Sequence, residues 1–132
     1  MPIPPNYTIS PEHRVVRLTY YEPVTFPEWV TTMEAIIHDA RFQRGFSFLV
    51  DRRNVPAPSP GFVESAAKYL REHEKEVGPA MRTATVVSDQ LADTVSGLVG
   101  PLPGFENLHV FKSIEEAEEW LSQGVAGEVL SA

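Results

Sequence analysis

A chain of 132 residues with 42% hydrophobic and 22% charged residues has the size and composition of one domain with a buried core. Its net charge of −7 disfavours nucleic acid and anionic membrane surfaces as partners, because both bind basic stripes. The absence of cysteine excludes disulfides and thiolate metal sites. No apolar run has the length of a membrane span or of a signal peptide, so we expect a cytoplasmic protein without membrane insertion.

The first part of the chain predicts a hairpin followed by a helix. Residues 7–9 and 13–21 are rich in β-branched and aromatic residues, and the short turn between them favours antiparallel pairing. Thr25 and Glu28 have the spacing of a capping box, which marks a helix start. Apolar residues then recur at helical spacing over residues 29–40, so a helix with one buried face is expected there.

The middle of the chain predicts a buried strand, a stiff loop and a second helix. Residues 46–51 are bulky and mostly apolar, as in a sheet interior, and three prolines restrict the loop that follows. Ser59 followed by Pro60 is typical of a helix N-cap and the first helical position. We therefore expect a helix over residues 60–77 with a rigid loop at its start.

Two further strand–helix units complete the predicted order. The first is a strand at residues 83–87 and a helix at 90–99, followed by a rigid loop with two prolines at 100–104. The second is a strand at 108–111 and a helix that ends near residue 121, and the start of this helix has capping-box spacing.

This order predicts one α/β domain at residues 1–122, followed by a flexible C-terminal tail at residues 123–132. Strands that alternate with helices favour parallel pairing, while the initial hairpin makes the first strand antiparallel. We expect a strand–helix superhelix of about five strands in sequential order. Such a sheet has no reversal of strand order, so it lacks the crevice in which doubly wound sheets bind ligands.

Side-chain alternation within the strands predicts that helices cover mainly one face of the sheet. One set of alternating positions is wholly apolar and comprises Val16, Leu18, Tyr20, Phe46, Phe48, Val50, Ala84, Val86, Leu108 and Val110. The other set is mixed, and its apolar members include Val15, Leu49, Val87 and Phe111. A sheet covered on both faces would be apolar in both sets. The mixed face is therefore expected to be open to a partner, or to a second copy of the chain in a homodimer.

Three segments resemble the SpoIIAA-like family, which is related to the STAS domain of anti-sigma-factor antagonists. They are Phe-Leu-Val-Asp-Arg-Arg-Asn at residues 48–54, Thr-Ala-Thr-Val-Val-Ser-Asp at 83–89, and a strand and capped helix ending in Ala-Glu-Glu-Trp-Leu at 108–121. The resemblance extends over residues 7–121 and implies a superhelix of sequential strands. It also implies a non-enzymatic STAS-like regulatory or protein-interaction module, whose partner would be a regulatory protein or a kinase.

The same resemblance places a regulatory serine. In the regulatory STAS proteins, a partner kinase phosphorylates a serine at the start of the helix that follows the third strand. Ser59 stands at this position, although the preceding acidic residue of the family motif is absent and Pro60 precedes Gly61. The resemblance therefore implies Ser59 as the candidate phosphorylation site.

The residues that follow the third strand form a candidate anion or docking site. The helix that begins after Ser59 presents free N–H groups and the positive end of its dipole, which favour an anion. Arg52 or Arg53 would add a charge-assisted hydrogen bond. The alternative is that Ser59 serves as an ordinary helix cap.

Two acidic residues follow parallel strands and are expected at the same edge of the sheet. Asp51 and Asp89 together would suit acid–base chemistry or a divalent cation. The alternative is that Asp89 or Ser88 caps the next helix, while Asp51 pairs with Arg52 or Arg53. No third ligand has a recognisable spacing, so neither a metal nor another cofactor is predicted.

Three hypotheses for the function follow. The first is the regulatory or interaction module, and the second is a domain that binds a small molecule or a lipid-type ligand between helices and sheet. The third is an enzyme that uses Asp51 and Asp89, but no catalytic motif supports it. Of the four histidines, His109 lies on the mixed sheet face, where it would suit a pH-sensitive interface.

Overall fold

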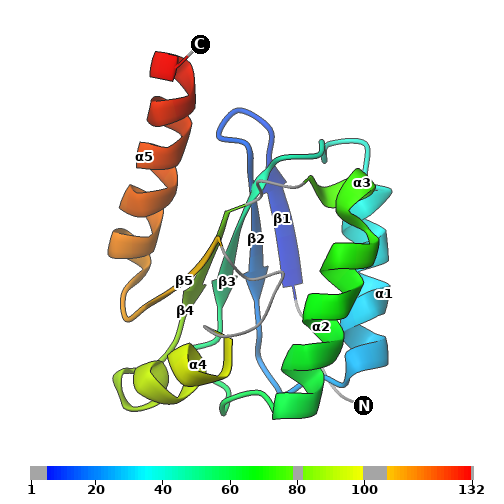
Figure 1. Ribbon diagram of the computed structural model, residues 1–132, viewed down its shortest axis with the longest axis vertical. Helices are drawn as coiled ribbons and strands as arrows, with labels where there is room; N and C mark the ends of the chain where they lie inside the picture. The colour runs from blue at the N-terminus through cyan, green and yellow to red at the C-terminus, as the bar shows by residue number, and fades with distance from the viewer. Residues whose placement is uncertain (1–5, 79–81, 100–106, 132) are drawn as a thin grey trace.

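The computed structural model describes residues 6–78, 82–99 and 107–131, with side chains up to residue 123. The elements are β1 (Asn6–Ser10), β2 (Val15–Thr19), α1 (Phe26–Ile37), β3 (Ser47–Asp51), α2 (Pro60–Glu72), α3 (Glu74–Val77), β4 (Thr83–Val86), the 3₁₀ turn η1 (Asp89–Leu91), α4 (Ala92–Val99), β5 (Leu108–Phe111) and α5 (Ile114–Ser131). This order confirms the predicted alternation of strands and helices (Figure 1).

The five strands form one sheet in the order β1-β2-β3-β4-β5. Strand β1 is antiparallel to β2, and all other neighbours are parallel. This topology confirms the predicted single α/β domain with sequential strands. The carboxyl ends of the parallel strands share one edge of the sheet, and because α1 follows β2 and α2 follows β3, both helices begin near that edge.

Local hydrogen bonds define the helix starts. At α1, the Thr25 hydroxyl accepts a hydrogen bond from the Glu28 N–H at 3.3 Å, and the Glu28 carboxylate accepts one from the Thr25 N–H at 3.1 Å. The Ser59 hydroxyl caps α2. At the start of α5, the Ser113 hydroxyl accepts a hydrogen bond from the Glu116 N–H at 3.2 Å. These starts were predicted correctly because each signal joins residues that are close in the chain.

Other helix bounds differ from the sequence-based expectation. The helix predicted over residues 60–77 is divided into α2 and α3 at His73, whose φ of −108° and ψ of 23° are not helical. The helix predicted at 90–99 begins with the 3₁₀ turn η1. The loop predicted at 100–104 lies outside the described residues. The predicted end of the last helix near residue 121 is wrong, because the backbone of α5 is helical through Ser131. The predicted domain boundary at residue 122 stays a prediction.

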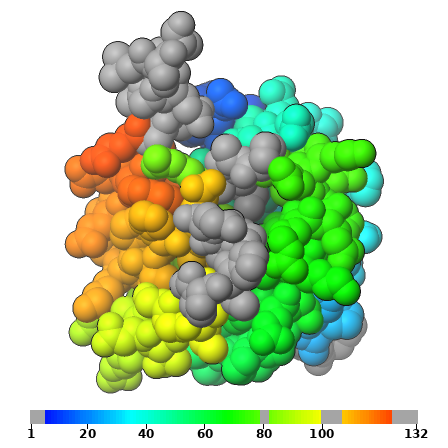
Figure 2. All heavy atoms as spheres, viewed as in Figure 1, coloured from blue at the N-terminus to red at the C-terminus, as the bar shows by residue number. Residues whose placement is uncertain are grey.

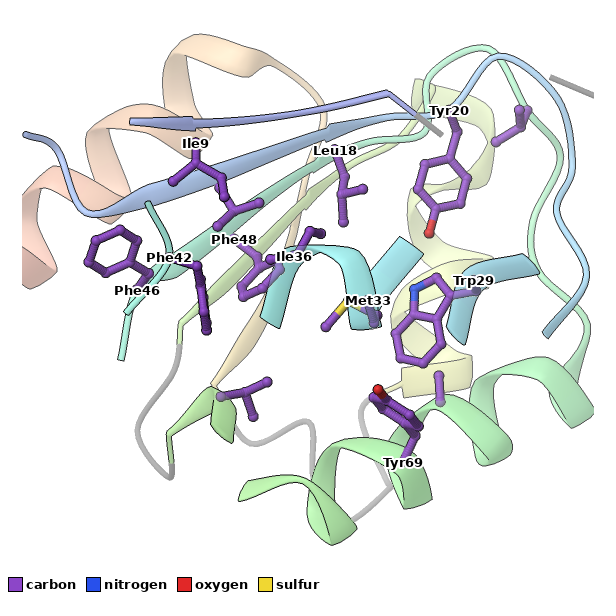
Figure 3. Packing of buried hydrophobic residues seen from close by; sticks show 14 residues of the cluster. Ile9, Leu18, Tyr20, Trp29, Met33, Ile36, Phe42, Phe46, Phe48 and Tyr69 are labelled. Carbon is purple, nitrogen blue, oxygen red and sulfur yellow. The ribbon is translucent and has the colours of Figure 1, made fainter. Parts of the chain in front are cut away.

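Helices α1, α2 and α4 cover one face of the sheet. The largest core cluster joins β2 and β3 to α1 and α2, and in it Trp29 packs edge-on against Tyr69 with ring centroids 5.3 Å apart (Figure 3). A second cluster on this face joins α2 to α4 through Val63, Val87 and Val95. Figure 2 shows the side chains of α2 (green) and α4 (yellow) meeting at the lower end of the molecule.

Helix α5 packs on the opposite face, and Figure 1 shows it on the other side of the sheet from α1 and α2. Its side chains Ala117 and Leu121 are buried against Leu49, Ala84 and Val86. The helices therefore lie mainly on one face, as predicted, but α5 also covers β3, β4 and β5 on the face that was expected to be open.

The side-chain alternation of β4 was predicted in the wrong phase. Pairing with β3 places Thr83 and Thr85 on the face covered by α1, α2 and α4, and Ala84 and Val86 beneath α5. Thr85 is 6% exposed, and threonine is tolerated at this buried position because its β-branched side chain packs well in a strand. A strand that is covered on both faces has no clear apolar–polar alternation, so the pattern did not reveal its orientation.

The mixed face offers less apolar surface than predicted. Leu49, one of the residues on which a homodimer was expected, is 2% exposed beneath α5. Val87, another of these residues, lies on the opposite face in the cluster of α2 and α4 and is 1% exposed. His109 is exposed on β5, where its ring stacks on Trp120 with centroids 4.3 Å apart. The homodimer and the pH-sensitive interface stay predictions.

Candidate anion site at the carboxyl edge of the sheet

Asp51, the last residue of β3, forms a bidentate ion pair with Arg53. Arg53 Nε lies 3.0 Å from Asp51 Oδ1, and Nη2 lies 2.8 Å from Oδ2. The Asp51 side chain is 15% exposed. The hydrogen bonds from Arg53 hold the pKa of Asp51 below its usual value, although burial acts in the opposite direction. Asp51 is thus neutralised by its near neighbour, one of the alternatives that the sequence allowed.

Replacing Asp51 with asparagine should lower the free energy of unfolding by about 0.5–1 kcal/mol at pH 7, because Arg53 loses its partner. The pKa of Asp51 is lowered in the folded state, so its contribution is present above the unfolded-state pKa near ~4 and is lost as the pH falls through the folded-state pKa. Urea unfolding at several pH values should therefore show that the difference in free energy of unfolding between wild type and Asp51→Asn shrinks below about pH 4.

Asp89→Asn is the control for this measurement, because its carboxylate is 81% exposed and a surface ion pair contributes little to stability. A difference between wild type and Asp51→Asn that stayed constant throughout the acid range would contradict the assigned role of the ion pair.

Asp89 is engaged separately from Asp51. Its carboxylate pairs with Lys112 Nζ at 2.9 Å, and both side chains are exposed. Ser88 stands at the N-cap position of η1, but its side chain makes no capping hydrogen bond. Asp51 and Asp89 share no hydrogen-bond or ion-pair partner in the part of the chain that the structure describes. This arrangement gives no geometric support to an enzyme that uses the two carboxylates together.

The charge of Arg52 has a different environment from that of Arg53. Arg52 is only 8% exposed, and none of the ion pairs among the described residues includes it. Its guanidinium lies 4.6 Å from the centroid of the Tyr20 ring, and Nη2 donates a hydrogen bond to the Pro56 carbonyl at 3.3 Å. Nε is buried and finds no acceptor within the described residues. Burial lowers the pKa of the Arg52 guanidinium, but an arginine stays charged in a protein. A buried cation without a counter-charge destabilises the fold.

Tyr20 does not supply the missing negative charge. Burial raises the pKa of Tyr20 to about 12, so its phenol is neutral at physiological pH. The ring does attract the guanidinium through a cation–π interaction, which is worth about 1–2 kcal/mol in a desolvated site. Figure 3 shows the Tyr20 side chain extending from the sheet toward Trp29 of α1. The Arg52–Tyr20 pair therefore lies where the sheet meets the start of the helical layer.

Arg52 lines a pocket of about 560 Å³ between the starts of two helices. We call it the outer pocket. Thr25 and Phe26 line it from the start of α1, and Ser59 and Phe62 line it from the start of α2. Helix N-termini carry a partial positive charge and bind anions through free N–H groups. The Ser59 hydroxyl accepts a hydrogen bond from the Phe62 N–H at 3.1 Å, so it acts as the predicted cap. The start of α1 also carries the Glu28 carboxylate, which accepts hydrogen bonds from the Thr25 N–H and hydroxyl. The positive charge at the outer pocket therefore comes from the Arg52 guanidinium and the start of α2.

A smaller apolar cavity of about 100 Å³ adjoins the outer pocket, between the sheet and helices α1, α2 and α4. We call it the inner cavity. Its walls are mostly core side chains, which include Met33, Phe48, Val50, Val63, Val95 and Leu108. The two spaces share Arg52, Pro58 and Phe62 as lining residues. Arg52 therefore stands where the apolar interior meets a pocket that is open to solvent.

The structure brings two of the predicted site residues, Arg52 and Ser59, together in the outer pocket. The other predicted residues lie outside its lining: Asp51, Arg53, Ser88 and Asp89. The sequence-based reasoning missed the contribution of α1. The capping box at Thr25 correctly placed the start of α1, but its position beside Ser59 depends on the packing of two strand–helix units.

No protein-family model, curated protein or solved structure matches this chain. None of the helices in the described ranges is long and apolar enough to cross a bilayer. Within the same ranges, no group of three or more histidine, aspartate or glutamate side chains is placed to hold a metal ion.

Proposed function

We propose that this chain is a non-enzymatic recognition domain that binds an anionic group in the outer pocket, with Arg52 as the counter-charge. The observation that carries this proposal is the burial of Arg52 without an acidic partner among the described residues. Buried arginines are normally paired with a carboxylate or phosphate. Here a bound anion would supply the missing partner, because the guanidinium lines a pocket that is open to solvent.

The start of α2 supports the same proposal. Helix α2 has 13 residues and no acidic residue in its first turn, so its dipole is fully developed at the pocket. An anion beside it would be favoured by this helix N-terminus and by a charge-assisted hydrogen bond from Arg52. Asp51 and Asp89 are already neutralised by Arg53 and Lys112 and do not line the pocket, so they would not oppose the anion at short range.

We further propose a STAS-like regulatory role for this recognition, as the resemblance to the SpoIIAA-like family implies. Support for the family assignment comes from the three matching segments and from the sequential strand order. The anion would be carried by a partner protein or by a small molecule. Phosphorylation of Ser59 belongs to the same proposal, since its hydroxyl group stands at the start of α2 on an exposed residue.

A titration of the ¹⁵N-labelled full chain with sodium acetate and with inorganic phosphate tests the proposal. We expect saturable chemical-shift changes of the Arg52 Nε–H signal and of the Phe62 amide, with dissociation constants on the order of millimolar for such small probes. The Arg53 Nε–H signal is the internal control, because that guanidinium is exposed and already paired with Asp51. Changes of equal size at Arg53, or changes that never saturate, would contradict a specific site at Arg52.

A further inference from the structure

We infer that the ligand of this site is a small amphipathic carboxylate, which places its head group on Arg52 in the outer pocket and a short apolar tail in the inner cavity. This inference rests on the proposed function and adds the chemical class of the ligand. It follows from the shared walls of the two spaces, since Arg52, Pro58 and Phe62 line both of them.

The chemistry of the two spaces is complementary to the two ends of such a molecule. The outer pocket contains Arg52, Ser59 and the start of α2 among apolar residues, and these charged and polar groups suit a negative head group. The inner cavity is lined mostly by aliphatic and aromatic side chains of the core, with Thr83 and Thr85 of β4 among them. A cavity of this kind favours an apolar group over water, which needs two to four polar partners. A purely inorganic anion would leave the inner cavity empty.

The size of the inner cavity limits the tail. An apolar cavity of about 150 Å³ holds a benzene molecule of six carbons. At the same volume per carbon atom, the inner cavity of about 100 Å³ holds roughly four carbon atoms. A straight or branched chain of that length fits, whereas the acyl chains of a membrane lipid do not. This size narrows the sequence-based hypothesis of a lipid-type ligand to a small organic acid.

The shape of the arginine fork favours a carboxylate as the head group. A guanidinium presents parallel N–H groups that match the two oxygens of a carboxylate, and such pairs are about twice as strong as neutral hydrogen bonds. The pocket has a single arginine among its described lining residues, and we therefore expect a single negative charge on the ligand. A phosphopeptide would use the outer pocket alone and would not depend on the volume of the inner cavity.

A chain-length series tests the inference by isothermal titration calorimetry on the full chain. Acetate, propionate, butyrate, pentanoate, hexanoate and octanoate are compared, with 1-pentanol as the neutral probe. We expect the affinity to rise about fourfold for each methylene up to pentanoate and then to level off or fall. Pentanol should bind at least ~10-fold more weakly than pentanoate, because it does not neutralise Arg52.

Ala66→Leu adds three carbons to a wall of the inner cavity and should abolish the dependence on chain length while acetate still binds. Ala66→Val repeats the test with less added volume if the leucine variant folds poorly, as judged by circular dichroism. Ala35→Leu is the matched control, because Ala35 is exposed on α1 and should leave the series unchanged.

The outcomes separate this inference from the proposed function. If acetate, phosphate and all longer acids bind with equal affinity, the apolar tail is wrong and the anion site stands. If phosphate binds more tightly than every carboxylate, the inferred ligand class is wrong. If no anion binds and the Arg52 Nε–H signal does not move, the proposed function itself is wrong.

Discussion

Replacing Arg52 with methionine is expected to weaken the binding of any anion by at least ~10-fold without unfolding the protein. The loss of affinity follows from the removal of a hydrogen-bonded charge, which is worth about 1.5–3 kcal/mol. The effect on stability is expected to be small, because two changes oppose each other. The variant loses the Tyr20 cation–π contact and the Pro56 hydrogen bond, but it also loses a buried cation that lacks a partner. We expect the free energy of unfolding to change by no more than about 1 kcal/mol.

Two further variants make this experiment specific. Arg53→Met removes the adjacent arginine, which is exposed and does not line either space, and should leave anion affinity within about twofold of wild type. Arg52→Lys keeps the charge but not the planar fork, so intermediate affinity is expected. Affinity is measured by calorimetry, and stability by urea unfolding. If Arg52→Met costs more than about 3 kcal/mol of stability, the guanidinium has a structural role and the site is not built for a ligand.

Replacing Gly78 with alanine is expected to destabilise the protein by about 2–4 kcal/mol, the largest effect on stability that we predict from a single methyl group. Gly78 has a φ of +103°, which side chains with a Cβ rarely adopt. A Cβ at this position would also lie 2.7 Å from the backbone nitrogen of Gly45. The Gly45 N–H donates to the Val77 carbonyl at 2.9 Å, so relief of the clash would disturb a hydrogen bond between two backbone segments.

Gly97→Ala is the matched control for Gly78→Ala. Gly97 lies within α4, and an added Cβ there meets no atom within 4 Å. Because alanine favours helix more than glycine does, this variant should gain up to about 1 kcal/mol. Both proteins are compared with wild type by urea unfolding. A Gly78→Ala variant as stable as wild type would show that the two backbone segments can separate at little cost.

The elements that the sequence predicted well depend on short-range signals. The capping box of Thr25 and Glu28, and the Ser59 cap before a proline, each act within one helical turn. The sequential strand order was inferred from the wholly apolar set of alternating strand positions, because helices lie mainly on one face when each strand adds next to its predecessor in the same direction. The fold class was therefore accessible from the sequence.

The packing of the sheet faces was less accessible. Ala84 and Val86 of β4 were assigned to the wholly apolar set, yet pairing with β3 places them beneath α5, and Thr85, which is 6% exposed, takes their place on the opposite face. The strand carries apolar or weakly polar residues at every position, so its periodicity does not distinguish the two faces. The position of α5 decides the assignment, and that position results from contacts between residues that are far apart in the chain.

The candidate site shows the same division between local and tertiary causes. Adjacent arginines after a strand predicted a charged turn, and Ser59 predicted a helix start, and both are present. The sequence alone did not distinguish Arg52 from Arg53, because the two residues have the same side chain. In the folded chain, Arg53 turns back to Asp51 in solvent, while Arg52 enters the protein over Tyr20 and remains without a counter-charge. That difference arises from the packing of the β3 end against the end of β2 and the start of α1, which brings a buried charge, two helix starts and an apolar cavity to one place.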